Sequence, residues 1–436
     1  MVLPGNEEYC VMPHDKPVTT AIIGAGNRSM VYSEYALQHP DKMRIVAVAD
    51  PDEMHRNKAA RKFNIPGHAC FESAEIFSRQ PKMADAVING TMDQLHVSTS
   101  VPVIEAGYHL LLEKPIAKSH EELTTLVDAA QKVDPILMIC HVLRYAPFYV
   151  AVQRIIAEGG IGRIMAIHTG ENVGYDHMGQ SFVRGKWNRE EVSPMLLQKC
   201  CHDMDVICWL KSGSAPKRVS SFGSLMYFRE ENAPEGAGLR CLVDCEIEST
   251  CHYSARKNFI GNELYSTHVW QGLEHVANPT DEQKIEDLKS DKNPYGRCVW
   301  RCDNDVVDHQ SAMIEFDDGS VATHEMVGGT AKACRTIHVR GTDGEIEGTM
   351  EDGFFVIRKP DADHEDLYQE KRVEVDSRGS MHGGGDLRLV ADFVRVVRGE
   401  EPSASTTHLM DSIHSHEIAY AADRSMRQGC VVSLGG

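Results

Sequence analysis

The chain contains no apolar run of the roughly 20 residues that a membrane-spanning helix needs, which argues against an integral membrane protein. Its first 17 residues also lack the basic and then apolar stretches of a secretory signal. Basic residues are scarce, because 45 Lys and Arg face 64 Asp and Glu, a net charge of −19. This excess repels nucleic acids and anionic membranes. We therefore expect a cytoplasmic protein that binds neither nucleic acid nor membrane.

The composition that remains is typical of a folded globular chain. Of the 436 residues, 42% are hydrophobic and 25% are charged, close to ordinary globular averages. Domains usually contain about 100 to 200 residues, so two domains are expected.

The first part of the chain alternates apolar strands with helical segments. Short β-rich segments are separated by helices of about 10 to 15 residues, a pattern typical of crossover units and a doubly wound parallel sheet. It predicts an N-terminal Rossmann domain over residues 1–147. The expected strands are residues 18–23, 44–50, 84–90, 109–115 and 136–145.

After residue 147 the pattern changes. Alternating strands flank turns at Asp317-Asp318-Gly319 and Asp343-Gly344, which predicts hairpins. We expect residues 148–436 to form an α+β domain with a large, mostly antiparallel open sheet and two closing helices, 386–398 and 410–428. A Cys-bearing insertion without clear period interrupts it at about 223–309.

A nucleotide site is predicted where the first strand ends. Gly24 and Gly26 lie between a strand and a helix, the context that a dinucleotide fingerprint requires. Ser29 takes the place of the usual third glycine, where close packing alone is at stake. Asp50 ends the second strand, where a carboxylate binds the adenosine ribose and repels a 2′-phosphate. NAD is therefore expected rather than NADP. NADP stays an alternative, because Arg56 lies close to Asp50 in the sequence.

Glu113-Lys114-Pro115, at the end of the strand 109–115, together with the turn Gly24-Ala25-Gly26-Asn27-Arg28, resembles the Gfo/Idh/MocA oxidoreductase family. The resemblance implies that Lys114 lies beside the nicotinamide and the reacting carbon of a sugar or polyol. Oxidation of a hydroxyl needs a proton acceptor there. It also implies a homo-oligomer, a dimer or tetramer, paired through the flat face of the second sheet.

The segment 193–210 is expected to be helical and to carry further catalytic groups. Lys199 and His202 are three residues apart and share a face, as do His202 and Asp205. Many members of the resembled family carry an Asp four positions before this His, where this chain has Gln198. We expect His202 to act as an acid/base or hydroxyl-orienting group, with Lys114 as its main partner and Lys199 assisting. A structural histidine beside a solvated lysine is the alternative.

The remaining site predictions follow the carboxyl edge of the first sheet and the start of the second domain. The predicted cofactor-binding residues are Gly24, Gly26, Asn27, Arg28, Asp50, Asp93, His96, Glu113, Lys114 and Arg144. The predicted substrate-binding residues are Tyr145, Tyr175, His177, Arg184, Trp187, Asp205 and His309.

Five cysteines are concentrated in the insertion. Disulfides are not expected in a cytosolic protein, and four thiolates around Zn²⁺ would fasten a loop that is poor in apolar residues. We expect a structural zinc ion at Cys241, Cys245, Cys251 and Cys298, with a metal-free cluster as the alternative.

Together these features predict an NAD-dependent oxidoreductase that transfers a hydride to or from a secondary hydroxyl or keto group of a sugar, polyol or glycoside. One alternative is a redox-neutral glycoside hydrolase, which uses tightly bound NAD for transient oxidation, elimination, hydration and re-reduction. A non-catalytic NAD sensor is a further alternative.

Overall fold

The computed structural model describes residues 16–376 and 381–435. The chain divides into two compact units, Met1–Arg154 with Asp376–His416, and Ile155–Val375 with Glu417–Gly436. The sequence placed a single boundary at residue 147. The first unit also contains the segment Asp376–His416, which lies far along the chain.

The sheet of the first unit has six strands, all parallel, in the order β3-β2-β1-β4-β5-β6. This is the doubly wound Rossmann order and confirms the predicted fold. The last predicted strand is shorter than expected, because residues 142–145 form a 3₁₀ turn. The two-residue β3 is too short for a sequence pattern to reveal. The strands are β1 Val18–Ile23, β2 Met43–Ala49, β3 Cys70–Phe71, β4 Ala86–Asn89, β5 His109–Leu112 and β6 Leu137–Ile139.

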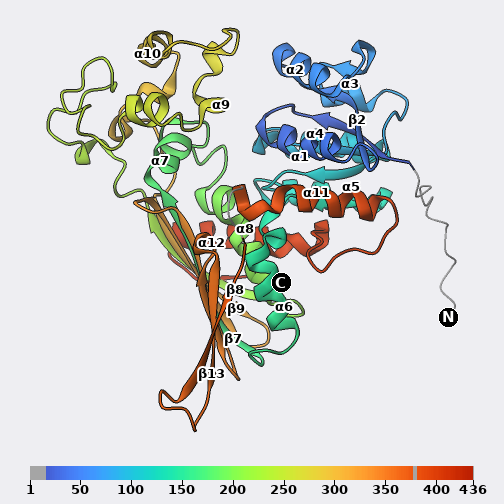
Figure 1. Ribbon diagram of the computed structural model, residues 1–436, viewed down its shortest axis with the longest axis vertical. Coiled ribbons are helices and arrows are strands. Elements are labelled where there is room, and N and C mark those ends of the chain that lie inside the picture. Colours follow the sequence, from blue (N-terminus) through green and yellow to red (C-terminus); the bar gives the residue numbers. More distant parts are fainter. Residues whose placement is uncertain (1–15, 377–380, 436) are drawn as a thin grey trace. The chain divides into compact units, whose positions relative to one another are not determined.

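Helices connect these strands, as the alternating pattern predicts (Figure 1). Their starts carry the expected signals: Asp52 and Ser119 each accept backbone N–H groups of the first turn that follows them, which satisfies donors that the helix itself leaves unpaired. The helices are α1 Asn27–Gln38, α2 Glu53–Phe63, α3 Ala74–Ser78, α4 His96–Glu105 and α5 His120–Val133, followed by α6 Pro147–Ala157.

Helix α11, Gly385–Val397, belongs to the first unit although it lies far along the chain. It packs against α1, beside which Figure 1 shows it. Its Asp386 pairs with Arg28, and its Asp392 accepts a hydrogen bond from the hydroxyl of Tyr145 at 2.9 Å. These buried polar contacts explain why the segment joins this unit.

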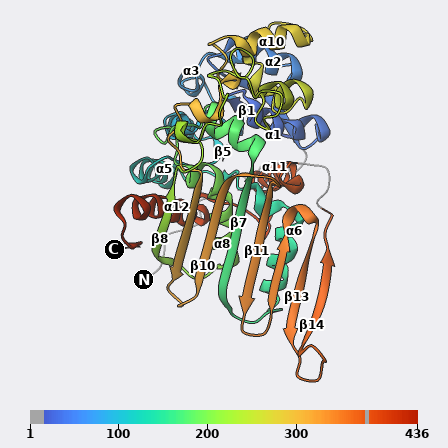
Figure 2. The ribbon, with the colours of Figure 1, turned by 90° about the vertical axis from the view of Figure 1, so that its left-hand side faces the viewer.

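The second unit contains a nine-stranded sheet in the order β14-β13-β12-β11-β7-β10-β9-β8-β15. Figure 2 shows its strands side by side. Every described pair is antiparallel except β7 with β10, so the predicted mostly antiparallel sheet and both hairpins are confirmed. The strands are β7 Ile164–Gly174, β8 Pro216–Ser224, β9 His309–Phe316, β10 Val321–Thr330, β11 Cys334–Gly341, β12 Glu345–Thr349, β13 Phe354–Pro360, β14 Tyr368–Glu374 and β15 Val432–Ser433.

Helix α8, Met195–Leu210, lies against β7 and β10. The closing helix α12 spans Leu409–Gln428, as the sequence predicts to within a residue. Alternate residues of β7, including Ile167, Thr169 and Glu171, are buried. Among the described residues, no helix is both long and apolar enough to cross a bilayer.

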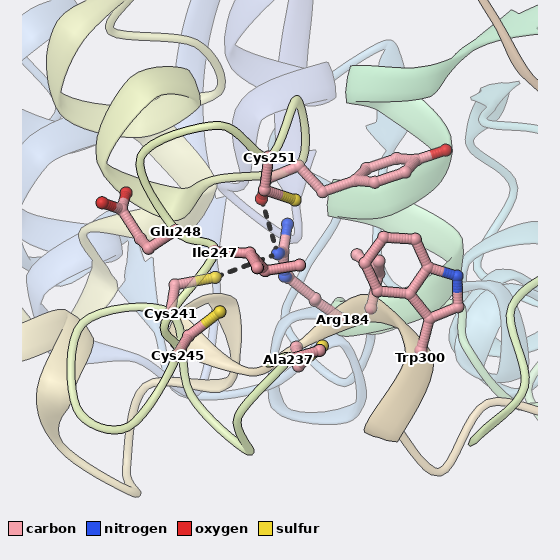
Figure 3. Close-up of a pocket in the computed structure, with 11 residues that line it drawn as sticks. Arg184, Ala237, Cys241, Cys245, Ile247, Glu248, Cys251 and Trp300 are labelled. Atoms are coloured by element: carbon pink, nitrogen blue, oxygen red, sulfur yellow. Dashed lines mark hydrogen bonds between the residues drawn. The ribbon is translucent and has the colours of Figure 1, made fainter. Parts of the chain in front are cut away.

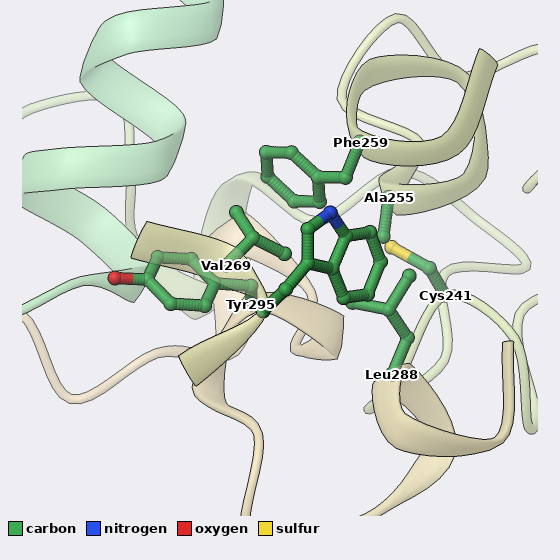
Figure 4. Packing of buried hydrophobic residues seen from close by; sticks show 7 residues of the cluster. Cys241, Ala255, Phe259, Val269, Leu288 and Tyr295 are labelled. Atoms are coloured by element: carbon green, nitrogen blue, oxygen red, sulfur yellow. The ribbon is translucent and has the colours of Figure 1, made fainter. Parts of the chain in front are cut away.

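The insertion occupies residues 225–308, between β8 and β9. It contains no named strand and only short helices, of which α9 Ser266–Val269 and α10 Asp281–Lys289 are α-helical. Its own hydrophobic cluster has seven buried residues, drawn in Figure 4, and includes Phe259, Trp270 and Cys241. Local hydrogen bonds, this cluster and further buried side chains such as Phe228, Tyr253 and Trp300 therefore stabilise the segment.

Candidate active site

The glycine turn after β1 has the geometry of a phosphate-binding loop. Gly24 has φ +73°, and a Cβ there would lie 2.8 Å from the backbone nitrogen of Thr91, so only glycine fits. A Cβ on Gly26, by contrast, would meet no protein atom within 4 Å. The backbone at Gly26 is therefore open to a ligand. Ser29 packs against Gly90, where an added Cβ would lie 2.3 Å from the Ser29 hydroxyl, so this contact supplies the close packing expected at that place.

The start of α1 can accept an anion. Gly26 is its N-cap, no side chain caps the helix, and no acidic residue lies in its first turn, so positive dipole and N–H groups are left for a phosphate. Asp50 is buried, and its two oxygens accept the N–H groups of Ala25 at 2.6 Å and Asp52 at 2.8 Å. A carboxylate has further lone pairs, so Asp50 can shape the turn and also bind a ribose. The residues present fit a dinucleotide.

Arg28 and Glu113, both predicted to bind cofactor, are paired with each other. The Arg28 Nε donates to Glu113 Oε1 at 2.8 Å, and its guanidinium also pairs with Asp386. The hydroxyl of Tyr32 donates to the same Glu113 oxygen at 2.9 Å. These contacts connect α1, the end of β5 and α11, so the two charged groups build the frame of the site.

Burial by itself raises the pKa of Glu113, but the charges of Arg28 and Lys114 outweigh burial and hold the pKa below its ordinary value. Glu113 therefore stays ionised at neutral pH. Its Oε2 accepts the backbone N–H of Lys114 at 2.5 Å, which fixes the chain where the lysine leaves the strand.

Lys114 follows the carboxyl end of β5 and is half-buried. The turn that carries it is held on both sides. A ring nitrogen of His96 lies 2.6 Å from the carbonyl oxygen of Pro115, and the N–H of Ile116 donates to His416 at 2.8 Å. The lysine thus extends from a rigid turn on the ligand edge of the parallel sheet.

Other residues predicted to bind the cofactor differ in their exposure and in their contacts within the protein. Asp93 and His96 are buried, and the second ring nitrogen of His96 lies 3.1 Å from the Thr91 carbonyl. Arg144 is 3% exposed and donates to the carbonyl oxygens of Thr406 and Asp411. Asn27 is exposed at the first position of α1. These placements favour Asn27 over Arg144 as a direct cofactor contact.

Tyr145, predicted to bind substrate, is 5% exposed and donates its hydroxyl to Asp392. Burial raises the pKa of its phenol strongly, and the neighbouring carboxylate adds to the effect. This hydroxyl therefore contacts α11, and the role of Tyr145 in substrate binding stays a prediction.

In the second unit, α8 brings Lys199, His202 and Asp205 onto one helix, as predicted. His202 and Asp205 are both buried. Lys199 lies 3.1 Å from Glu171 on β7 and 3.5 Å from a ring nitrogen of His177. Lys199 is therefore the counter-ion of a buried carboxylate rather than a solvated lysine.

A buried ionic network that the sequence analysis missed surrounds Lys199. Arg335 on β11 pairs with Glu171 at 2.7 Å and with Asp203 at 3.2 Å. Burial and the neighbouring carboxylate raise the pKa of Asp203 to about 7. For Glu171, burial opposes ionisation, but Arg335 and Lys199 lower its pKa. The sequence offered one signal of this network, the charged residue Glu171 at an inward-facing position of a strand.

One further group could hold a metal ion. Cys200, Asp203 and His324 are buried, and one ligand atom of each lies within 4.8 Å of the others. The Nδ1 atom of His324 lies 2.8 Å from the Thr169 hydroxyl, and Asp203 pairs with Arg335. Two of the three residues therefore have partners in the core of this unit.

The aromatic residues predicted to bind substrate are grouped with the insertion. The His177 ring stacks on Tyr265 with centroids 5.6 Å apart. Tyr175 contacts His252 and Tyr253 edge-on. These contacts bring the end of β7 and two segments of the insertion together.

Two other predicted substrate residues lie elsewhere. The half-buried Trp187 has the ammonium of Lys186 4.5 Å from its ring centroid. His309 is 39% exposed and lies 2.9 Å from Asp308, whose carboxylate also accepts backbone N–H groups of Met226 and Tyr227 at the start of the insertion.

Arg184 is placed differently from the prediction. It is 2% exposed and points into a buried pocket lined by cysteines of the insertion (Figure 3). Its N–H groups reach the carbonyls of Arg297 and Tyr253 and the sulfur of Cys241. These contacts occupy its guanidinium, and its predicted role in substrate binding stays a prediction.

The first unit thus has the fold and turn of a dinucleotide-binding oxidoreductase. The chain belongs to the Gfo/Idh/MocA oxidoreductase family. Residues 18–141 match its NAD-binding Rossmann fold, and residues 153–434 match its C-terminal alpha/beta domain.

Curated relatives share about a quarter of their aligned residues with this chain. YteT of Bacillus subtilis is 22% identical over 80% of this chain and 81% of that protein. Inositol 2-dehydrogenase of Corynebacterium glutamicum is 24% identical over 62% and 77%. The 2,7-anhydro-N-acetylneuraminate hydratase of Escherichia coli is 25% identical over 47% and 52%.

Among solved structures, levoglucosan dehydrogenase in complex with NADH and levoglucosan superposes with a TM-score of 0.69. The identity is 18%, and the match covers 97% of this chain and all of that one. The likeness extends the fold assignment across nearly the whole chain.

Proposed function

We propose that the protein is an NAD-dependent oxidoreductase acting on a secondary hydroxyl, or the corresponding keto group, of a sugar, polyol or glycoside. The observation that carries the proposal is the first unit itself, where an open glycine turn, Asp50 and Lys114 all follow the carboxyl ends of parallel strands. Relatives named inositol 2-dehydrogenase support the substrate class.

The residues of the first unit divide the work. The backbone at Gly26 and the first turn of α1 bind the pyrophosphate, and Asp50 binds the ribose and disfavours a 2′-phosphate. When bound, NAD accepts or supplies the hydride. Lys114 Nζ takes the hydroxyl proton during oxidation and returns it during reduction, while the Glu113–Arg28 pair keeps its turn in place.

His202 remains our proposal for a second acid/base or orienting group on α8. Lys199, held by Glu171, is proposed to orient its neighbours rather than to carry the proton. A cytoplasmic location and a small-molecule carbohydrate substrate complete the proposal.

The test compares turnover of Lys114→Met with turnover of the unaltered enzyme. Without the proton acceptor, kcat/KM should fall about 10²–10⁴-fold, while NADH binding persists because Lys114 does not build the phosphate loop. A panel of sugars, 3-keto sugars and aryl glycosides, followed at the reduced-nicotinamide absorbance, identifies the substrate. Lys118→Met is the matched control, since that lysine pairs with Glu122 at the surface. Unchanged turnover in Lys114→Met, or no binding of NAD⁺ or NADH, contradicts the proposal.

Net glycoside hydrolysis is the second candidate, favoured by the relative named as a hydratase, whose reaction name implies no net oxidation. It requires the same NAD site and Lys114. Cleavage of an aryl glycoside with no accumulation of NADH would select this candidate, and stoichiometric NADH would select the dehydrogenase.

A further inference from the structure

The insertion is long and has little regular secondary structure. In residues 225–308 no named strand joins the sheet, and one hydrophobic cluster has seven buried residues (Figure 4). A covalent or metal cross-link can stabilise such a segment.

Four cysteines from two separate parts of the insertion surround one pocket. Cys241, Cys245, Cys251 and Cys298 all line it, and the first three are labelled in Figure 3. All four are free thiols, so no disulfide supplies the cross-link. The cavity has a volume of about 10 Å³, which is room for a single water-sized atom.

The same pocket contains a cation. Arg184 is almost completely buried, and its N–H groups donate to Tyr253 O at 2.8 Å, Arg297 O at 2.7 Å and Cys241 Sγ at 3.6 Å. Glu248 also lines the pocket and accepts the Ser254 hydroxyl, but among the described residues no carboxylate forms an ion pair with Arg184. A buried charge is costly unless an opposite charge compensates it. Neutral thiols do not supply that charge, whereas thiolates do.

We propose that Cys241, Cys245, Cys251 and Cys298 bind one zinc ion as thiolates, and that Arg184 donates an N–H to the Cys241 thiolate. Four thiolates exceed the charge of Zn²⁺ by two, so the centre is a net anion that compensates the guanidinium. Binding releases the four thiol protons to solvent and oxidises nothing.

The geometry requires an adjustment. Among the described residues, no three of these sulfurs lie within 4.8 Å of one another, whereas zinc holds each sulfur at about 2.3 Å. The four side chains must therefore turn inward around the small cavity.

This centre has a structural role. Arg184 ends the helical segment Met178–Arg184, which follows His177 and Tyr175. The zinc site fastens both cysteine segments to that helix and so fixes the aromatic cluster at the end of β7. The inference is independent of the proposed function, because its readouts do not require turnover.

The first experiment is metal analysis of the full-length protein, purified without chelator and passed through gel filtration. We expect about one zinc per chain, and less than about a tenth of an equivalent in Cys251→Ser. Cys302→Ser is the matched control, because this half-buried cysteine donates to the Cys298 carbonyl and does not line the pocket. Less than about a tenth of an equivalent of zinc in the unaltered protein overturns the proposal. Zinc loss in Cys302→Ser equal to that in Cys251→Ser also overturns the proposal. The same holds if the protein contains iron and acid-labile sulfide in place of zinc.

A second experiment does not depend on a variant folding. Replacing the native metal by Co²⁺ should give the intense sulfur-to-cobalt and d–d absorption of a tetrahedral thiolate site. An octahedral spectrum overturns the assignment.

A third experiment tests the role of Arg184. In competition with a chelator, Arg184→Met should bind zinc about 10–100-fold more weakly than the unaltered protein does. Equal retention in this variant overturns the role assigned to the guanidinium.

Discussion

Glu113 connects three elements of the first unit through one carboxylate. Its oxygens accept hydrogen bonds from the Arg28 guanidinium, the Tyr32 hydroxyl and the backbone N–H of Lys114. Sequence resemblance assigned this residue to the cofactor site, but its role as an anchor depends on Asp386, some 270 residues further along the chain, which shares the same arginine.

Glu113→Gln should therefore destabilise the protein by about 1–3 kcal/mol at neutral pH, because a charge-assisted buried contact is weakened. The folded-state pKa of Glu113 is lowered, so its contribution is present above the unfolded-state pKa of about 4.3 and is lost as pH falls through the folded-state value. The difference in unfolding free energy between the unaltered protein and the variant should therefore narrow as the pH falls below the unfolded-state pKa.

Urea unfolding at several pH values measures this difference. Glu34→Gln, which breaks the exposed pair with Lys62, is the control and should change stability by no more than about 1 kcal/mol. A difference in the Glu113 variant that grows at acid pH would contradict the assigned charge state.

At the scale of the element, the turn between β1 and α1 contains one glycine that the fold requires and another that leaves space for a ligand. Gly24 needs its positive φ and has no room for a Cβ, whereas Gly26 has φ −73° and open space. Gly24→Ala should cost about 1–3 kcal/mol of stability.

Gly26→Ala should leave stability within about 0.5 kcal/mol but weaken NADH binding at least about tenfold, since the methyl group occupies the space of the pyrophosphate. Thermal melting and fluorescence titration measure the two quantities. Unchanged NADH affinity in Gly26→Ala would show that the dinucleotide does not approach this turn.

At the scale of the whole molecule, one face of the nine-stranded sheet carries exposed apolar side chains. Phe222 is 75% exposed, Met313 56% and Val321 40%. The strand register places them on the same face, since Met313 pairs with Ser220 and Thr323. Exposed apolar groups on a sheet face indicate an interface.

We predict a homo-oligomer, a dimer or tetramer, paired through this face. Light scattering should give a mass above the 48.5 kDa of one chain, and Phe222→Glu combined with Met313→Glu should reduce it toward that value. Leu239→Glu, a substitution at an exposed leucine of the insertion, should leave the mass unchanged. A monomeric unaltered protein would refute the prediction.

Much of the first unit could be predicted because its structure is encoded locally. Strand β1 was predicted to the residue, and its glycine turn and Asp50 carry their chemistry within one strand–helix–strand segment. Contacts between distant parts of the chain could not be predicted in this way. Arg144, Tyr145 and Arg184 were predicted to contact ligands, and the structure shows hydrogen bonds of each to groups 57 to 267 positions away.

The amino-acid sequence by itself determined the Rossmann half, the mostly antiparallel sheet, the nucleotide turn and the four cysteines of interest, since periodicity and turn chemistry act over a few residues. Only the tertiary structure decided which charges are paired. In the folded chain α11 belongs to the first unit, and Lys199 lies in a network with Glu171, Arg335 and Asp203. The guanidinium of Arg184 lies among the cysteines of the insertion. The reason is that burial makes an unpaired charge costly, and the partner that relieves this cost is chosen by packing rather than by distance along the chain.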